Sequence, residues 1–346
     1  MKLWHKILLG ILAFIIFFVG KTLINAGLFT KIEPHFNGVV TKIEDFNGGE
    51  DIVIDRKTGL ALIASTNFNS TDNGAIFLLN LKEENPKPIN LTTNLPFKSF
   101  HPHGMSFYQS PNGTKRLFVI NHRKYGQFIE IFQFNDSTLV HLESITNPLF
   151  VSPNDIVAVG ERAFYLTNDH DESFSDWRNK KDLLQIPMGN ICYFDGNNAQ
   201  VMAEGILYAN GINKSLDGTK IFVASASEKK IKVFDRNSSS GKLIESDEIA
   251  INGPDNIDVD EKGNLWVGCH PKLLAYLAHS KDHSKLSPSE IIKITYKGKG
   301  SAHLESIYLN NGDEISGSSV GLIFGDKLLI GSVYEKHVLL NTLKQR

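Results

Sequence analysis

The stretch NDIVAVGERAFYLTND (residues 154–169) starts with two polar residues, continues as a short apolar run, turns at Gly160 and ends in a second apolar run. Two short apolar runs joined by a turn with glycine are typical of a β-hairpin. The polar pair Asn154-Asp155 stands at the head of the first strand. The same unit recurs along the chain.

Six segments share this order of a polar head, a strand, a tight turn with glycine and a second apolar strand. Further strand-like runs, such as residues 74–81 and 128–134, lie between them and can supply outer strands. The six segments cover residues 50–65, 102–121, 154–169, 210–225, 255–269 and 318–332.

The spacing of these segments predicts the architecture. Their starts lie 45 to 63 residues apart, near the roughly 40 to 50 residues of a four-stranded propeller blade. One blade cannot bury both faces of its sheet, whereas six stacked around an axis can. No linker rich in Pro, Gly or Ser interrupts the rhythm. The sequence therefore predicts an all-β fold, a six-bladed β-propeller over residues 31–346, with a short helix over residues 176–186.

The composition excludes several classes of protein. The 346 residues include 36 Lys and Arg against 38 Asp and Glu, for a net charge of −2. Because there is no basic excess to bind phosphates, we expect no nucleic-acid partner. A hydrophobic fraction of 41% is enough for a core. The two cysteines, Cys192 and Cys269, are too few for a disulfide framework or a cysteine-based zinc site.

Residues 1–30 are predicted to form a signal-anchor outside the propeller. The uncharged segment Ile7–Gly20 is flanked by Lys2, Lys6 and Lys21, and a helix that is apolar on every side does not suit a globular surface. As a helix it spans about 21 Å, so reaching across a core of roughly 30 Å requires extension to Phe29. A clear small-residue cleavage site is missing. We therefore expect a retained membrane anchor, the secretory pathway and a lumenal or extracellular propeller, which is secreted if the segment is cleaved.

Sequons for N-glycosylation agree with a secretory route and a glycoprotein. They stand at Asn69, Asn90, Asn112, Asn135, Asn213 and Asn237. An asparagine-rich chain also produces such triplets by chance, so they add little weight.

Oxygen donors stand at the head of four of the six segments. Equivalent positions of the blades enter the channel of a propeller at one end, so these residues are expected to converge. Carboxylate and amide oxygens suit Ca²⁺, whereas zinc or copper would call for imidazole or thiolate. Neighbouring side chains on a strand point opposite ways, so the doublets indicate two stacked calcium ions. Asn and Asp also begin ordinary turns. The heads are Glu50-Asp51, Asn154-Asp155, Asn210 and Asp255-Asn256, with His103 heading a fifth segment.

Two histidines form a second constellation. His103 in FHPHGMS and His122 in VINHRKY belong to the two strands of one hairpin, which brings residues about twenty apart alongside each other. In an imidazole pair, one ring can act as general base on water while the other holds its tautomer. The alternative is that both are packed or loop histidines. Of the others, His101, His170 and His270 are expected to be supporting or structural, and His279 and His283 to face solvent.

These residues resemble the serum paraoxonase/arylesterase family, from about residue 50 to residue 334. The resemblance rests on ten motifs in order: EDI, PHGMS, VINH, PNDIVAVG, FYLTNDH, ANGIN, DNIDVD, NLWVGCHP, GSSV and KLLIGSVY. The family fold is a six-bladed propeller, in agreement with the repeat. The resemblance implies hydrolysis of aryl esters and lactones, with organophosphates hydrolysed by some members, and an uncleaved hydrophobic N-terminus.

The resemblance also implies roles for individual residues. His103 and His122 match the family's histidine dyad. Mammalian members join the two ends of the propeller by a disulfide, but neither cysteine lies there in this chain, so ring closure is expected to rest on strand pairing. The ligands implied are Glu50, Asn154, Asn210, Asp255 and Asn256 for a catalytic calcium, and Asp51, Asp155 and the Met105 carbonyl for a structural calcium.

The expected reaction is calcium-dependent hydrolysis, in which the ion stabilises the oxyanion and a water attacks, deprotonated by His103 or positioned by Glu50. Two alternatives remain open from the residues. One is a calcium propeller of the gluconolactonase or strictosidine-synthase-like kind. The other is a non-catalytic binding propeller that calcium only braces.

Overall fold

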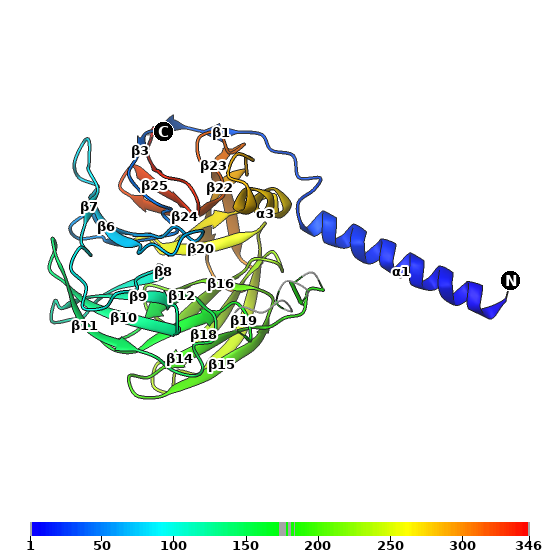
Figure 1. The fold of residues 1–346 in the computed structure, drawn as a ribbon, viewed down its shortest axis with the longest axis horizontal. Coiled ribbons are helices and arrows are strands. Elements are labelled where there is room, and N and C mark those ends of the chain that lie inside the picture. Colours follow the sequence, from blue (N-terminus) through cyan, green and yellow to red (C-terminus); the bar gives the residue numbers. More distant parts are fainter. Residues whose placement is uncertain (1, 173–177, 179–180, 183, 345–346) are drawn as a thin grey trace.

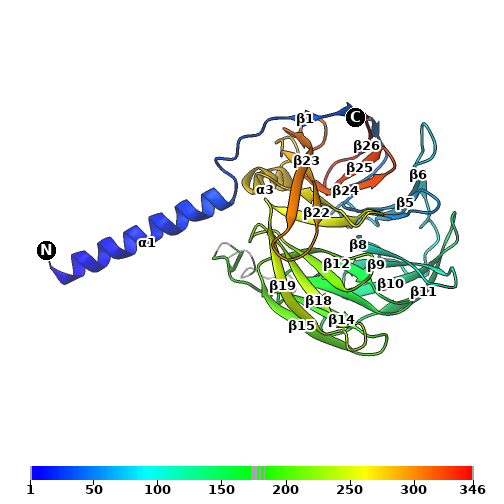
Figure 2. The same ribbon diagram turned by 180° about the vertical axis from the view of Figure 1, so that it is seen from behind.

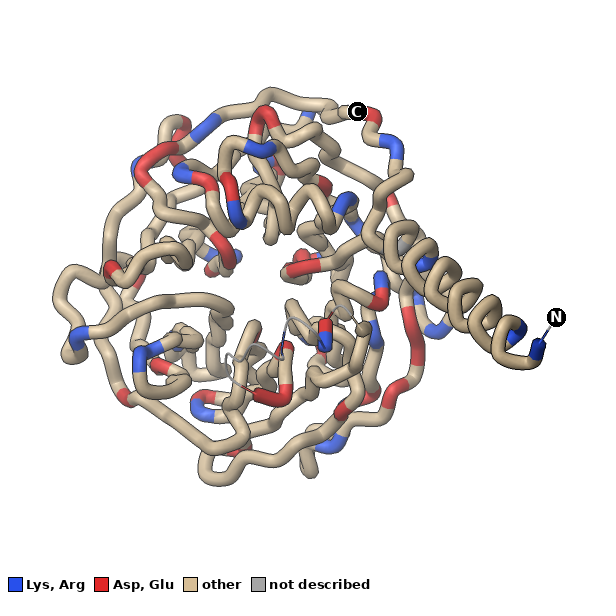
Figure 3. The backbone as a smooth tube through the Cα atoms, turned by 45° about the vertical axis from the view of Figure 1, so that its right-hand side comes forward, with Lys and Arg blue, Asp and Glu red and all other residues tan. Residues whose placement is uncertain are grey.

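The computed structural model describes residues 2–172, 178, 181–182 and 184–344. Within these residues, six antiparallel sheets surround a common axis (Figures 1 and 3). The predicted six-bladed propeller is confirmed. The predicted helix over residues 176–186 lies largely outside the described residues.

Each of the first four blades consists of four consecutive strands. They are β4 (Asp51–Asp55), β5 (Leu60–Ser65), β6 (Ala75–Asn80) and β7 (Ile89–Asn90) in the first blade; β8 (Pro102–Gln109), β9 (Lys115–Arg123), β10 (Gly126–Phe134) and β11 (Leu139–Ile145) in the second; β12 (Pro153–Ala158), β13 (Phe164–Asn168), β14 (Gly189–Phe194) and β15 (Ala199–Ile206) in the third; and β16 (Ala209–Lys214), β17 (Lys220–Ser225), β18 (Lys230–Arg236) and β19 (Leu243–Ala250) in the fourth.

The last two blades take strands from both ends of the chain. The fifth contains β20 (Pro254–Val259), β21 (Leu265–Cys269), β22 (Ser289–Tyr296), β23 (Ala302–Asn310) and β1 (His35–Phe36); the sixth contains β24 (Ser318–Phe324), β25 (Lys327–Ser332), β26 (Val338–Leu343), β2 (Gly38–Val39) and β3 (Lys42–Ile43). Both β2 and β3 pair with β26. The expected closure by strand pairing is therefore present, and the N-terminal strands provide it.

The first strand of every blade is the innermost one. Contacts join β4 to β8, β8 to β12, and so on around the ring until β24 meets β4. All six polar-headed segments predicted from the sequence supply these inner strands. Their heads consequently lie around one channel.

The core lies between neighbouring blades. Because successive side chains of a strand point to opposite faces, Val119 packs toward the first blade and Phe118 toward the third. Both side chains are fully buried, and such burial stabilises the fold by about 1.5–3 kcal/mol per side chain. Two buried faces explain why this strand reads as the continuous apolar run LFVI (residues 117–120).

A long apolar helix, α1 (Leu3–Asn25), projects from the propeller (Figure 2). By length and composition it can cross a membrane, and none of its apolar window is buried inside the structure. An N-terminal signal sequence would share both properties. The predicted apolar helix is confirmed.

A second helix, α3 (Leu273–Lys281), follows β21. It corrects one prediction, because His279 is only 1% exposed instead of facing solvent. Its Nδ1 donates to the Lys285 carbonyl at 2.7 Å. His283 is exposed as expected, and its ring stacks on Tyr334 with centroids 5.0 Å apart.

The sequons differ in exposure. Five of the six asparagines are exposed, whereas Asn213 is half-buried and its Nδ2 donates to the Ile257 carbonyl at 2.7 Å. Asn213 is therefore unavailable as an acceptor in the folded chain.

Candidate functional site

Apart from His122, which stands near the end of β9, the predicted site residues stand where the inner strands begin. In five blades the pairing register between the first and second strand shifts at this point, for example between Pro153 and Ile156 and between Pro254 and Ile257. Such bulges add a residue to one strand and turn its side chains. The irregularity therefore places the polar heads at the rim of the channel, and regular pairing resumes beyond them.

Two glycines allow the blades to meet here. A Cβ on Gly104 would lie 2.5 Å from the Asn154 carbonyl oxygen, and one on Gly211 would lie 2.4 Å from the Asp255 carbonyl oxygen. Contacts this close exclude any side chain. The glycines that follow His103 and Asn210 thus bring each head against the next blade.

The predicted catalytic calcium ligands are all buried, with exposed fractions of 6% or less. Asn256 Nδ2 donates to Glu50 Oε1 at 2.9 Å and to the Glu50 carbonyl at 3.1 Å, which joins the fifth blade to the first. Ser319 Oγ of the sixth blade donates to the same carbonyl at 2.5 Å. The ligands concerned are Glu50, Asn154, Asn210, Asp255 and Asn256.

Four oxygens of this set have no hydrogen-bond partner although they are buried: Glu50 Oε2, Asn154 Oδ1, Asn210 Oδ1 and Asn256 Oδ1. A buried acceptor without a partner costs about 1–3 kcal/mol. Four of them, contributed by four blades to one channel, form the oxygen-rich surroundings that Ca²⁺ binds. Among the described residues, no three His, Cys, Asp or Glu side chains are grouped to hold a metal, because three of the five donor residues here are asparagines.

Asp51 and Asp155 lie one residue further along their strands and are also buried. Asp51 accepts hydrogen bonds from the Met105 amide at 2.6 Å and the Ile52 amide at 2.8 Å. Asp155 accepts from the amides of Ile156 and Ile212, each at 2.7 Å. Each carboxylate thus accepts one hydrogen bond from an amide of the next blade. The contact seen at Met105 is made by its amide, and its predicted carbonyl role stays a prediction.

Burial is the main cause of raised pKa values among these carboxyl groups. Burial, followed by repulsion from Glu50, raises the pKa of Asp51 to about 8. Burial and Asp51 raise the pKa of Asp155. Burial also raises the pKa of Asp255, although His270 opposes it. A divalent cation would relieve this repulsion.

His103 and His122 are brought together as predicted. His103 Nδ1 lies 2.8 Å from His122 Nε2, and His103 Nε2 lies 3.5 Å from Glu50 Oε1. Burial and then the neighbouring His103 lower the pKa of His122 to about 4. Burial acts to lower the pKa of His103, but Glu50 outweighs it and the pKa is raised.

Gln127 completes this chain of contacts and was not among the predicted residues. Its Oε1 lies 2.5 Å from His122 Nδ1. Gln127 stands on β10 opposite His122 in the strand register. Only the hairpin turn after His122 could have indicated it in the sequence.

Two further residues support Asp255. His270 Nε2 lies 2.8 Å from Asp255 Oδ2, as expected for a supporting histidine. The ring of Tyr276, on α3, stacks on His270 with centroids 3.8 Å apart. Sequence reasoning missed Tyr276 because no motif ties this helix to the channel.

The two other histidines that were expected to be supporting or structural make different contacts. His170 Nε2 contacts Asp182 Oδ1 at 2.9 Å, and the His101 amide donates to Asn121 Oδ1 at 2.8 Å.

Comparison with solved structures supports the fold. The chain superimposes on a luciferin-regenerating enzyme with a TM-score of 0.57 and 15% identity, over 88% of this chain and 95% of that one. A putative gluconolactonase gives a TM-score of 0.56 and 12% identity, over 92% and 96%. At these identities the likeness concerns the fold alone.

Comparison with known sequences defines the family. The arylesterase family model matches residues 31–341. The human serum paraoxonase/arylesterase 2 is 34% identical over 290 residues, which cover 80% of this chain and 79% of that protein. The human serum paraoxonase/arylesterase 1 is 33% identical over 306 residues, 84% of each chain. A shared family over the whole propeller, together with the fold, makes this chain a member of the serum paraoxonase/arylesterase family of hydrolases.

Proposed function

We propose that the protein hydrolyses aryl esters and lactones with the help of two calcium ions. The observation that carries this proposal is the set of four buried, partnerless oxygens at one end of the channel. They are chemically suited to Ca²⁺, and they come from the residues that the family resemblance assigns to it. Membership of the family favours this function over a gluconolactonase-like or non-catalytic propeller.

In this proposal Glu50, Asn154, Asn210, Asp255 and Asn256 hold the catalytic ion, and Asp51, Asp155 and the Met105 carbonyl hold the structural one. A bound calcium supplies positive charge that stabilises an oxyanion on the substrate carbonyl. His270 and Asn256 position the donors. His270 contacts Asp255, and Asn256 uses its Nδ2 on Glu50 so that its own Oδ1 stays free.

In this proposal the histidine pair takes up the proton that the attacking water loses. If Gln127 Oε1 accepts the proton of His122 Nδ1, then His122 Nε2 accepts from His103 Nδ1, and His103 Nε2 is left with its lone pair. That nitrogen can take a proton from an attacking water. The imidazolium formed lies 3.5 Å from Glu50 Oε1, which stabilises it.

Calcium dependence tests the proposal directly. Titration of the metal-free chain with Ca²⁺ should show two sites, and hydrolysis of phenyl acetate and of a γ- or δ-lactone should stop on chelation and return with Ca²⁺. Lactone hydrolysis that survives chelation and dialysis would remove the proposed metal role. Calcium binding that raises the melting temperature without any turnover would favour the non-catalytic propeller.

The role of Gln127 is testable by substitution. Gln127→Met keeps the shape of the side chain and removes the acceptor, so the loss of about one hydrogen bond should lower kcat about tenfold. Gln127→Glu restores an acceptor and should recover activity. Gln133→Met, on the same strand, is the matched control. Equal kcat values for the Met and wild-type chains, with unchanged melting temperatures, would show that Gln127 does not hold the dyad.

We also propose that α1 anchors the protein in a membrane of the secretory pathway, with the propeller on the lumenal or extracellular side. The helix is 23 residues long, or about 35 Å, against roughly 30 Å for the hydrocarbon core. Its apolar window makes no buried contact with the propeller. The five exposed sequons agree with this side. A chain that lacks residues 1–30 should then be recovered without detergent.

A further inference from the structure

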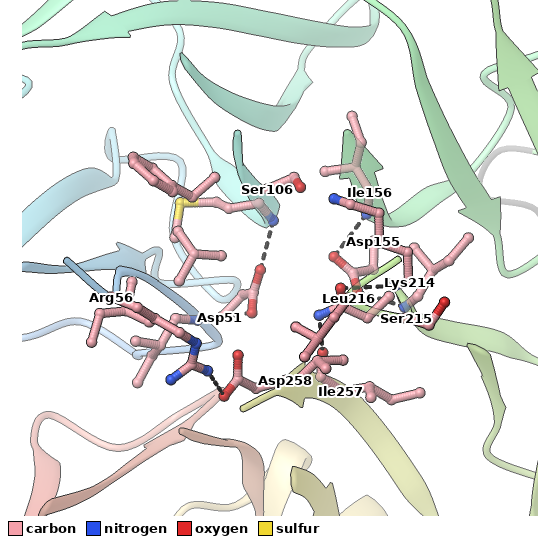
Figure 4. A pocket seen from close by; sticks show the side chains of 18 residues that line it. Asp51, Arg56, Ser106, Asp155, Ile156, Lys214, Ser215, Leu216, Ile257 and Asp258 are labelled. Atoms are coloured by element: carbon pink, nitrogen blue, oxygen red, sulfur yellow. Dashed lines mark hydrogen bonds and ion pairs between the residues drawn. The ribbon is translucent and has the colours of Figure 1, made fainter. Parts of the chain in front are cut away.

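The inner strands also border a cavity further along the channel. A cavity of about 210 Å³, here called the far-end pocket, is lined by residues of five inner strands (Figure 4). These residues follow the polar heads along each strand, so the pocket lies beyond them. It includes Asp51 and Asp155, but none of the five proposed ligands of the catalytic ion. A water in the liquid takes up about 30 Å³, so the pocket has room for a partly hydrated cation.

Asp51 and Asp155 link the pocket to the proposed structural calcium. Their carboxylates receive amide hydrogen bonds from Met105 and Ile212, which hold them in place. Figure 4 shows both carboxylates pointing into the space between the strands. The pocket therefore leads from the surface to the residues that would bind the inner ion.

The cationic side chains of the pocket are tied to its walls. Arg56 Nη2 donates to Asp258 Oδ2 at 2.5 Å, and Nη1 donates to the Ile323 carbonyl at 2.7 Å. Lys214 Nζ donates to the Ala158 carbonyl at 2.7 Å. Burial lowers the pKa of Lys214 to about 8. The Arg56–Asp258 pair joins the first blade to the fifth at the wall of the pocket.

The opposite end offers a less direct path. There Asn256 bonds to both the side chain and the carbonyl of Glu50, and an inner ion leaving at that end would have to pass the proposed catalytic site. A cation in the catalytic site would also repel an ion that moves from the inner site toward that end, since like charges in a poorly hydrated channel interact strongly.

We infer that the structural calcium enters and leaves through the far-end pocket, and that the Arg56–Asp258 ion pair restricts its passage. This inference rests on the proposed function, because it requires that Asp51 and Asp155 hold a cation. It gives the two ions separate routes, so the catalytic ion can exchange while the structural one stays in place.

The test is to plug the pocket. Leu216 lines it and is 63% exposed, so Leu216→Cys should accept a bulky maleimide. The native thiols will not compete, because both are buried, and burial raises the pKa of Cys192 to about 12 and that of Cys269 well above its usual value. Calcium-loaded full chain in detergent is mixed with an excess of a fluorescent calcium chelator. We expect a fast and a slow phase of Ca²⁺ release, with the label slowing the slow phase about tenfold.

Two labelled controls locate the effect. Ile244→Cys, 71% exposed on β19, should leave both phases unchanged. Leu274→Cys, 41% exposed on α3 near the catalytic end, should leave the slow phase unchanged. As a second arm, Arg56→Ala should accelerate the slow phase, and Arg56→Lys should do so less.

The outcomes separate the two proposals. A slow phase that full labelling at position 216 leaves unchanged, or that labelling at position 274 slows instead, would overturn the route while two ions remain bound. Equilibrium titration that finds fewer than two ions would overturn the two-calcium assignment itself, and the route with it.

Discussion

The Asn154→Ala variant is expected to hydrolyse phenyl acetate about 10³-fold more slowly than the wild type, a loss similar to that of an oxyanion-stabilising group. Asn154 Oδ1 is buried without any protein partner, so the substitution removes an oxygen that supports no other part of the fold. The backbone contact with Gly104 remains. The loss should therefore appear in catalysis and in calcium affinity, with little change in the melting temperature of the metal-free chain.

Two variants make this measurement specific. Asn154→Asp keeps an oxygen at the same place and should retain part of the calcium affinity. Asn213→Ala removes an inner-strand asparagine whose Nδ2 already bonds to the Ile257 carbonyl, so it should affect stability more than turnover. kcat/KM, calcium titration and thermal unfolding are compared for all three. Near-normal turnover by Asn154→Ala would contradict its assignment to the catalytic ion.

Deletion of residues 1–44 is expected to abolish folding, whereas deletion of residues 1–30 should leave the propeller intact. The longer deletion removes β1, β2 and β3, which pair with β23 and β26. It also removes Ile43, which is 9% exposed in the core. Lost pairing, lost burial and newly opened strand edges should together approach the 5 kcal/mol or so that many domains have in total.

Soluble yield, circular dichroism and thermal unfolding of the two deletions provide the measurement. The shorter deletion should melt cooperatively at the temperature of the full chain. If the longer deletion also melted cooperatively at that temperature, β2 and β3 would be dispensable and the ring would close by some other contact.

The inner half of each blade was predictable because its pattern is local. Both faces of an inner hairpin are buried, so it reads as apolar runs around a glycine turn, as in residues 154–169. The heads were predictable because the repeated segments share one phase, and five of the six carry an oxygen donor or a histidine at that position. The pairing of β2 and β3 with β26 was not, since strands of two residues carry no periodic pattern.

The histidine pair was predictable for the same local reason, whereas its surroundings were not. His103 and His122 stand on adjacent strands of one hairpin, so simple register arguments place them together. To predict that Gln127 lies beside His122, one must know the length of the next turn, which sequence alone does not determine. His279 was wrongly expected in solvent because the sequence around it is polar. That polar pattern does not show that α3 buries the His279 ring.

Because the last two blades are made from both ends of the chain, synthesis cannot complete the ring until β26, the last strand, appears. The residues of β2 and β3 leave the ribosome roughly 300 residues before β26, which at about 5–20 residues per second means tens of seconds. Throughout this interval an open-ended arc of blades exposes unpaired strands, the form most prone to aggregate. Substitutions in β26 should therefore leave more chains unclosed and degraded, so that less protein matures. The activity of the molecules that do close should change less.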